Sequence, residues 1–269
     1  MVKKLFKHEI LAWLRVWTPM QIILLAVAAF GRVWQFFEND SMTYDIIYGS
    51  AIALYVVAII ASIGLATVFG VVRFYKNLFS REGYLSFTLP VTPAQHIWVK
   101  LLTAGMFSVL SLLVVVLSFG IFTAGELFVE IIKALSYIIK QAIPLLGAHL
   151  IFYIIEFVLL IGVAFLAEYL LYYVCIALGQ TFKKNRVIGA VGVYFIYYII
   201  NQVIGTILSV IIMLLAETDF FLAIGRFVEE NPFETVHIVF CVGLVFGALL
   251  AALYFVITHA VMRKKLNLE

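Results

Sequence analysis

The sequence predicts an all-α integral membrane protein with six transmembrane helices. Of its 269 residues, 65% are hydrophobic and only 12% are charged, and the mean hydropathy is +1.14. Soluble globular domains carry about a quarter charged residues, so this composition argues strongly against a soluble protein. Several apolar runs also exceed the roughly 20 residues that cross the hydrocarbon of a bilayer.

The N-terminal segment, residues 1–16, is predicted to form an amphipathic helix on the inner leaflet. Phe6, Ile10 and Trp13 recur at helical spacing among Lys4 and Lys7, and no small-residue cleavage site of a signal peptide follows. Its basic face would meet anionic lipid or a partner protein. Anchoring and partner docking are compatible interpretations.

The six spans are expected within one transmembrane domain, two in residues 17–72, two in 101–178 and two in 187–262. The apolar runs themselves cover 17–37, 46–72, 101–124, 143–178, 187–216 and 237–262. The first contains Arg32, whose long side chain can reach the interface. The fourth is longer than a perpendicular crossing needs, so we expect it to tilt, to break or to extend into water. In the sixth, Gly243, Gly247 and Ala251 follow the spacing that lets helices approach closely.

The cations predict the orientation of the chain. Fourteen of the eighteen Lys and Arg residues lie in the two termini, in the segment 73–100 and in the short loop 179–186. The positive-inside rule places these regions in the cytoplasm, and an even number of spans agrees with both termini lying on one side.

Two segments on the opposite side are predicted to be short amphipathic helices. Residues 126–140 place polar side chains at helical spacing opposite an apolar face, and residues 220–228 repeat this pattern before Asn231-Pro232 ends the helix. Such helices either fill the headgroup layer or gate an exit.

Polar side chains inside the spans are the first functional candidates, because an ionisable group in hydrocarbon needs a partner or a wet cavity. His149 and Glu156 are seven residues apart, on nearly the same helical face, so they could share a proton. Glu168 lies further along the same run. Pairing between helices, or a position nearer the membrane surface, is the favoured explanation of these residues.

Two aromatic and amide stripes form a second group of candidates. They either hold helices together through hydrogen bonds or line a path for a ligand. In the second span the stripe consists of Tyr48, Tyr55 and Ser62, and in the fifth of Tyr194, Tyr197, Tyr198, Asn201 and Gln202.

Motifs of enzymes are not found in the sequence. It has no phosphate-binding loop, nucleophile elbow, zinc-protease motif or dinucleotide fingerprint. Glu234 and His237 have a spacing seen in carboxylate metal sites, but a single copy at a membrane boundary is weak support, and no metal is expected. Cys175 and Cys241 both fall inside spans, which gives no disulfide framework. We therefore expect no catalytic residues in this chain.

The segment 73–100 is the long polar interruption of the chain. Thr92-Pro93-Ala94-Gln95 is a capping box with proline at the first helical position, so the third span's helix should begin there. Residues 73–80 either extend the second span or form a separate short helix. The result is a basic, aromatic helix-turn-helix in the cytosol, and such an exposed cluster implies a protein partner.

The phrase RFYKNLFSREGYLSFTLPVTPAQHIWVKLL, with LGQTFKKNRVIG further on, resembles the six-span permease subunits of bacterial type-2 ATP-binding-cassette (ABC) exporters, especially Gram-positive ones. The order of elements is similar across most of the chain, although the large outer domain of some relatives is missing. This resemblance implies a bacterial plasma-membrane protein with cytoplasmic termini. It implies two permease copies, two separate ABC ATPases that bind ATP and magnesium, lipid contacts and no nucleic acid.

The resemblance also implies residue roles. In that family a coupling helix in the first cytoplasmic loop docks on the ATPase, and the second and fifth spans border the translocation path. Carried onto this chain, the path would be bordered by the two stripes, namely Tyr48, Tyr55, Ser62, Tyr194, Tyr198, Asn201 and Gln202. The docking contacts would be Tyr75, Phe79, Arg81, Glu82, Tyr84, Lys183 and Lys184.

The function expected from this resemblance is ATP-driven export of a lipophilic or amphipathic cargo, such as an antimicrobial or toxic peptide or a drug, by alternating access. The alternative is a secondary transporter or channel that works alone and uses His149, Glu156 and Glu168 as a proton path.

Overall fold

The computed structural model of the chain describes residues 2–80, 83, 88, 90–182 and 185–264. Among these residues the secondary structure is helical, without a strand. Six of the described helices are long and apolar enough to cross a membrane. The chain is therefore an all-helical, multi-pass membrane protein, as predicted.

The chain divides into two compact units, Met1–Gln141 and Ala142–Glu269. The first contains α1 (Val2–Gln35), α2 (Met42–Phe79), α4 (Pro93–Phe122) and most of α5 (Glu126–Leu146). The second contains α6 (His149–Gly179), α7 (Arg186–Leu215), α8 (Asp219–Glu230) and α9 (Pro232–Lys264).

Two helix boundaries confirm the local signals in the sequence. The Thr92 hydroxyl accepts a hydrogen bond from the backbone N–H of Gln95, and the Gln95 side chain accepts one from the N–H of Thr92, so α4 begins with the predicted capping box. At the other boundary α8 ends with Asn231 as its C-cap, directly before Pro232. Of the two alternatives for residues 73–80, extension of the second span is the one observed, because α2 continues to Phe79 as one helix. α1 runs from Val2 to Gln35 without a break, so the described part of the predicted N-terminal helix is continuous with the first span.

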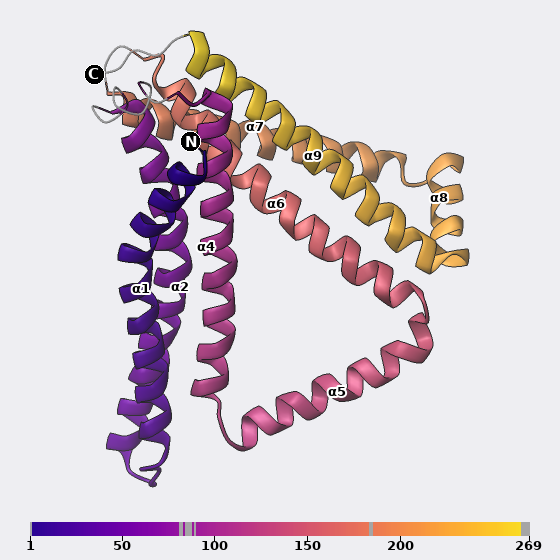
Figure 1. Ribbon diagram of the computed structural model, residues 1–269. Helices are drawn as coiled ribbons and strands as arrows, with labels where there is room; N and C mark the ends of the chain where they lie inside the picture. Colours follow the sequence, from indigo (N-terminus) through magenta and orange to yellow (C-terminus); the bar gives the residue numbers. More distant parts are fainter. Residues whose placement is uncertain (1, 81–82, 84–87, 89, 183–184, 265–269) are drawn as a thin grey trace. The chain divides into compact units, whose positions relative to one another are not determined.

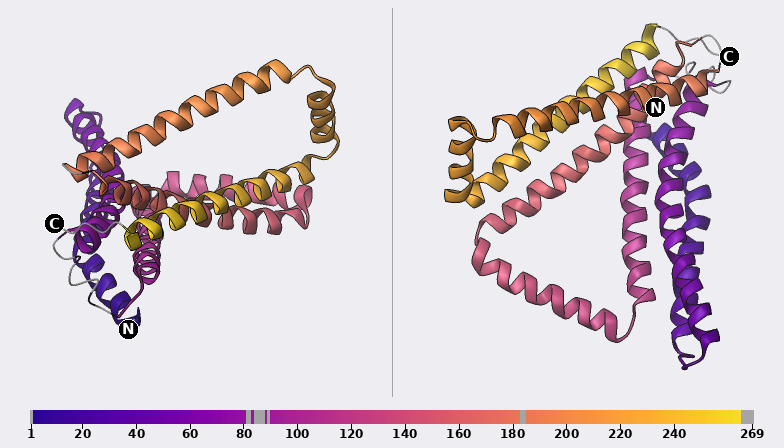
Figure 2. Two further views of the ribbon diagram at one scale, coloured as in Figure 1. Left: turned by 90° about the horizontal axis from the view of Figure 1, so that it is seen from above. Right: turned by 180° about the vertical axis from the view of Figure 1, so that it is seen from behind.

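In the first unit α1, α2 and α4 pack side by side as a three-helix bundle, which both orientations of the ribbon show (Figures 1 and 2). Leu24 and Ala28 of α1, Tyr55 of α2 and Phe122 of α4 form its apolar core. The rings of Tyr55 and Phe122 stack with centroids 4.5 Å apart. Gly31 lies so close to the Phe122 ring that no larger residue fits without rearrangement.

Buried polar side chains cross-link this bundle along its length. Near the middle, the Ser62 hydroxyl of α2 donates to Gln21 Oε1 of α1 at 3.1 Å, and Trp17 Nε1 donates to Ser111 Oγ of α4 at 2.7 Å. Further along, Gln35 Nε2 donates to the Tyr48 hydroxyl at 3.1 Å. Interhelical hydrogen bonds of this kind stabilise helix association in membranes by about 0.6–2 kcal/mol each.

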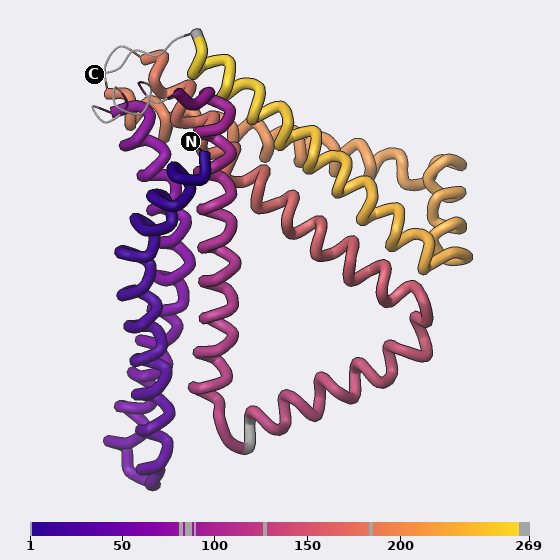
Figure 3. The backbone as a smooth tube through the Cα atoms, in the orientation of Figure 1, coloured from indigo at the N-terminus to yellow at the C-terminus, as the bar shows by residue number. Residues whose placement is uncertain are grey.

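In the second unit α6 packs against α9 and, at its C-terminal end, against α7 (Figure 3). A Cβ on Gly243 would lie 3.1 Å from Leu160 Cδ1, and one on Gly247 would lie 2.9 Å from Val163 Cγ1. The small-residue pattern predicted to pack closely therefore does so. At the turn between α6 and α7, a Cβ on Gly179 would lie 2.7 Å from that of Ala190, so this turn also depends on a glycine.

The long apolar run 143–178 breaks near its start. Pro144 lies in the last turn of α5, and Gly147 adopts a positive φ of 52° before α6 begins at His149. Glycine tolerates this left-handed conformation because it lacks a Cβ. Of the three predicted alternatives for this run, a break is the one observed.

The contact at Gly247 gives a test of the α6–α9 packing. Gly247→Val should lower the thermal unfolding midpoint of the purified protein in detergent, because overpacking a tight contact costs about 1–3 kcal/mol. The matched control is Gly64→Val in α2, where a new Cβ would meet nothing within 4 Å. Equal midpoints for the two variants would contradict the packing described.

Candidate functional site

The most strongly constrained polar site lies where α1, α2 and α4 meet beside the segment between α2 and α4. Its centre is Glu9 of α1, which is 3% exposed. Glu9 Oε2 accepts a hydrogen bond from Arg73 Nε of α2 at 2.7 Å, and Glu9 Oε1 accepts one from Lys100 Nζ of α4 at 2.7 Å. Asn77 Nδ2 lies 3.5 Å from Oε1 and completes the cluster.

This cluster combines one carboxylate with two cations, so it carries a formal charge of +1. The side chain of Lys100 is 6% exposed and that of Arg73 is 20% exposed, so Lys100 depends more on Glu9 for its compensation. An ionised group withdrawn from water is tolerated only when it is paired and hydrogen-bonded. Each cation thus fixes its helix to the same carboxylate.

The two cations lie near the helix ends that flank the predicted cytoplasmic loop. Arg73 is in the last two turns of α2, and Lys100 is in the second turn of α4. Glu9 therefore holds together the two ends of the predicted cytoplasmic loop. Local structure reinforces this arrangement, because the capping box fixes the start of α4 and Phe74 packs on Phe79 with ring centroids 5.6 Å apart at the end of α2.

The role of Glu9 was not predicted from the sequence, although Arg73 and Lys100 were recognised as part of the cytoplasmic basic segment. A signal for it exists, because Glu9 is the one acid among the first 37 residues, which contain five Lys and Arg residues. An isolated acid on the apolar side of a basic helix indicates an internal partner. Which cations meet it depends on the packing of three helices.

The residues predicted to dock an ATPase are only partly covered by the structure. Tyr75 is half-buried on α2. Phe79 is 2% exposed, which removes its side chain from the accessible surface in this conformation. Arg81, Glu82, Tyr84, Lys183 and Lys184 lie outside the described residues.

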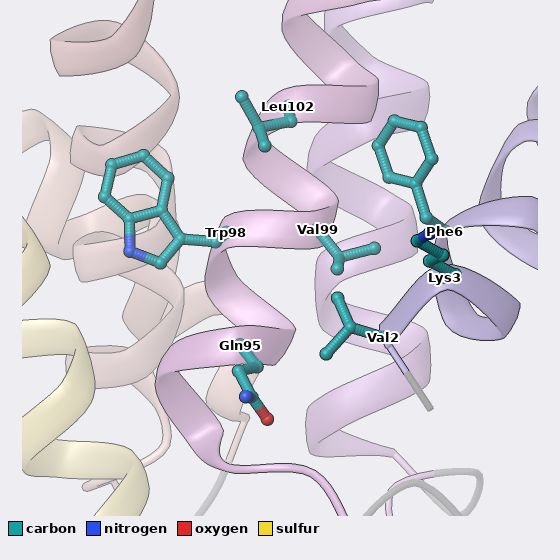
Figure 4. Close-up of a pocket in the computed structure, with 7 residues that line it drawn as sticks. All are labelled: Val2, Lys3, Phe6, Gln95, Trp98, Val99 and Leu102. Atoms are coloured by element: carbon teal, nitrogen blue, oxygen red, sulfur yellow. The ribbon is translucent and has the colours of Figure 1, made fainter.

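A shallow apolar groove of about 310 Å³ lies near this end of the bundle, between the first turns of α1 and those of α4. Figure 4 shows Val2, Lys3 and Phe6 on one side and residues of α4 on the other. Trp98, which also lines the groove, is 45% exposed. The groove places an aromatic and apolar surface beside a lysine.

The stripe on α2 is used within the first unit. Tyr55 and Ser62 are 4% and 3% exposed, and the Tyr55 hydroxyl is 2.9 Å from Ser118 Oγ of α4. Tyr48 is bonded to Gln35, as described above. These contacts support the interpretation that this stripe holds helices together, and in this conformation they withdraw Tyr55 and Ser62 from any path.

The stripe on α7 is different, since α7 has no buried residue. Tyr194 and Tyr198 are 36% and 58% exposed, and Asn201 and Gln202 are exposed as well. Within the stripe, Asn201 Nδ2 donates to the carbonyl oxygen of Tyr197 at 2.9 Å. Within the second unit this face of α7 is therefore left uncovered, and it remains the better candidate for a path or for contact with another surface.

The intramembrane ionisable residues form one cluster and one separate pair. His149 and Glu156 do not bond directly, because His237 of α9 lies between them, with Nε2 at 3.0 Å from His149 Nδ1 and Nδ1 at 2.9 Å from each Glu156 oxygen. Glu168 instead accepts a hydrogen bond from the Tyr172 hydroxyl at 2.8 Å. At 1.5 Å per residue, Glu168 is roughly 18 Å along α6 from Glu156.

His237 is the member of this cluster whose role the sequence did not reveal. Its spacing from Glu234 had suggested a weak resemblance to a metal site. Among the described residues, no group of three or more His, Cys, Asp and Glu side chains is arranged to hold a metal ion. Cys175 and Cys241 are both free thiols.

Comparisons with protein-family models, with curated proteins and with solved structures found no match to this chain.

The Glu9 cluster predicts a measurable coupling between α1 and α4. Glu9→Gln should destabilise the protein by about 3–5 kcal/mol, because it leaves two cations near one another without their carboxylate. Lys100→Met should also destabilise it, since Glu9 Oε1 then loses its charged partner and keeps only the longer contact with Asn77. Unfolding midpoints of both single variants and of the double variant form the measurement.

The double variant should lose clearly less stability than the two single variants would together, because the second change removes a group already deprived of its partner. Glu38→Gln, at an exposed position, is the control and should leave the midpoint unchanged. Strict additivity would show that Glu9 and Lys100 do not act as a pair.

Proposed function

We propose that this chain is the membrane-spanning permease subunit of an ATP-driven type-2 ABC exporter in a bacterial plasma membrane. The observation that carries the proposal is the Glu9 cluster, which ties the first two spans and the third to the ends of one basic loop. The resemblance of residues 73–102 to the coupling region of such permeases, the six apolar helices and the lack of a phosphate-binding loop in the sequence also support it.

In this proposal the cluster keeps the neighbouring parts of α1, α2 and α4 in one fixed arrangement. Closure of two ATPase subunits around ATP and magnesium would push on the loop between α2 and α4. Because Glu9 binds both Arg73 and Lys100, that push would move the two helix ends together with α1 instead of separating them. The spans would then repack and change the side of the membrane to which the cargo site opens.

The cargo proposed for this mechanism is lipophilic or amphipathic, such as a toxic or antimicrobial peptide or a drug. The exposed tyrosines and amides of α7 provide aromatic faces and hydrogen-bonding groups for such a molecule. A second copy of the chain would complete the path, since one copy leaves this face uncovered.

The second candidate function is a proton-driven transporter, and the hydrogen-bonded series His149, His237 and Glu156 is the observation that favours it. Glu168 weighs against a continuous path, because it pairs with Tyr172 far along α6. The purified chain in liposomes separates the two functions. Flux driven by a proton gradient without nucleotide would favour the second.

The docking prediction is tested by co-expressing the chain with the soluble phosphate-loop ATPase that the proposal expects a neighbouring gene to encode. Arg81→Glu and Glu82→Arg should each reduce co-purification and permease-stimulated ATP hydrolysis by tenfold or more, because reversed charges at a small contact repel the partner. Arg226→Glu in α8, which is predicted to lie outside, is the matched control and should have no effect. Unchanged binding and turnover in the first two variants would refute the assigned docking site.

The orientation is tested separately with single cysteines in a Cys175→Ser and Cys241→Ser background. A cysteine replacing Gly83 should react with a membrane-impermeant maleimide only after the cells are opened, whereas one replacing Thr218 should react in intact cells. Labelling of position 83 from outside would remove the basis for a cytoplasmic ATPase contact.

A further inference from the structure

The cluster of His149, His237 and Glu156 has no role in the exporter mechanism described above. His149 is the first residue of α6, Glu156 is two turns further along, and His237 lies in the second turn of α9. The side chains of His237 and Glu156 are 19% and 18% exposed, so the cluster is enclosed but reachable by protons. The cluster joins the N-terminal ends of the two helices. The first of these ends follows Gly147 and the second follows Asn231.

With Glu156 ionised and both imidazole rings neutral, the hydrogen-bonding capacities of the groups fix where the hydrogens lie. An ionised carboxylate can only accept, so His237 Nδ1 carries a hydrogen and donates it to Glu156. In a neutral imidazole the other nitrogen is an acceptor, so His237 Nε2 accepts from His149 Nδ1–H across 3.0 Å. All donors then point toward Glu156, the cluster carries one negative charge, and His149 Nε2 is left as the site for an added proton.

One added proton preserves this arrangement. On His149 Nε2 it makes the ring an imidazolium, whose Nδ1–H still donates to His237. The cluster becomes neutral overall, and the bond from a charged donor is stronger than the one it replaces. The contact between α6 and α9 is therefore kept.

A second added proton weakens the cluster wherever it binds. On His237 Nε2 it would place two N–H groups against each other across the 3.0 Å gap, beside two positive charges. On Glu156 it would remove the ionic acceptor and leave a weaker hydrogen bond to a neutral carboxyl group. Both outcomes loosen the same end of the helix pair.

We propose that His149, His237 and Glu156 form a proton-binding latch that holds these ends of α6 and α9 together and releases them on acidification. Histidine ordinarily changes its charge between about pH 5 and 8, and the release follows the second added proton, not the first. On the predicted orientation the latch faces the outside of the cell and responds to external pH. Its action within the isolated chain depends on neither an ATPase nor the identity of the cargo.

Other ionisable groups nearby do not account for the same behaviour. On α6 the Tyr153 hydroxyl donates to the carbonyl oxygen of Phe233 at 2.9 Å, and its ring lies 4.6 Å from that of His237. On α9 the nearest charged residue is Glu234, which is exposed. The segment 203–215 of α7 contains no ionisable side chain.

The remaining neighbour is α8, which packs against α9. Its charged residues are Asp219, Arg226, Glu229 and Glu230, and none of them has a hydrogen bond or ion pair to the cluster among the described residues. The pH response is therefore assigned to the three residues of the latch.

The test measures the distance between α6 and α9 by spin labels on the purified chain in lipid nanodiscs. Cysteines replace the exposed Ile151 and Val239 in the Cys175→Ser and Cys241→Ser background. Between pH 8 and pH 5 the long-distance population should rise severalfold. Glu156→Gln, which imitates the protonated carboxyl group, should show a raised long-distance population already at pH 8.

Asparagine provides the matched variants, because its amide N–H can replace the Nδ1–H of histidine without titrating. The double variant His149→Asn and His237→Asn should fold and show a much smaller pH-dependent change than the parent, because only Glu156 can still take up a proton there. His259→Asn, at a distant position of α9 where the ring stacks on Phe255, should respond as the parent protein does. A distance distribution independent of pH in the parent, or a full response in the asparagine double variant, would overturn the proposal.

Discussion

The arrangement of one end of the first unit, predicted to face the cytoplasm, depends on the buried carboxylate of Glu9. Its two oxygen atoms, on α1, pair with Arg73 of α2 and Lys100 of α4, so three helices meet at one side chain. Because Glu9 and Lys100 are both buried, each depends on the other: either group alone would be an uncompensated charge. A hydrophobic contact at this place could hold the helices equally well, but it would tolerate sliding. Two charge-assisted hydrogen bonds at 2.7 Å fix a single arrangement.

The two units use different means to hold their helices together. In the first, polar side chains recur along α1 at Glu9 and Gln21, which are buried, and at Gln35, which is half-buried, and each is hydrogen-bonded to a neighbouring helix. In the second, α6 and α9 approach closely over Gly243 and Gly247, and hydrogen bonds concentrate at the His237 end. Lipid tails are as apolar as the helices, so close packing and hydrogen bonds must supply the association energy. The glycine contact itself has no directional bonds. A change in the hydrogen bonds at its one polar end would therefore alter how firmly α6 and α9 are held together.

The sequence predicted the features that depend on local chemistry. The capping box at Thr92 and the stop at Asn231-Pro232 are fixed within four residues, and the spans follow from hydropathy alone. The pairing of Glu9 with Lys100 involves residues 91 positions apart, and that of His149 with His237 involves residues 88 apart. Their residue types were visible, but their partners depend on helix rotation and tilt, which apolar sequences with weak periodicity do not specify.

The exposed face of α7 carries polar side chains that bear on what lies beyond one copy of the chain. Asn201 satisfies part of its amide through the Tyr197 carbonyl, whereas the Gln202 side chain has no hydrogen-bond partner among the described residues. An amide without a partner in hydrocarbon is costly, so this face requires either water or another protein surface. On the same helix the Tyr197 hydroxyl accepts a hydrogen bond from that of Tyr254 of α9 at 2.9 Å, so Tyr197 is held within the second unit. A second copy meeting this face, with a wet path between the copies, would satisfy both the amide and the exposed tyrosines.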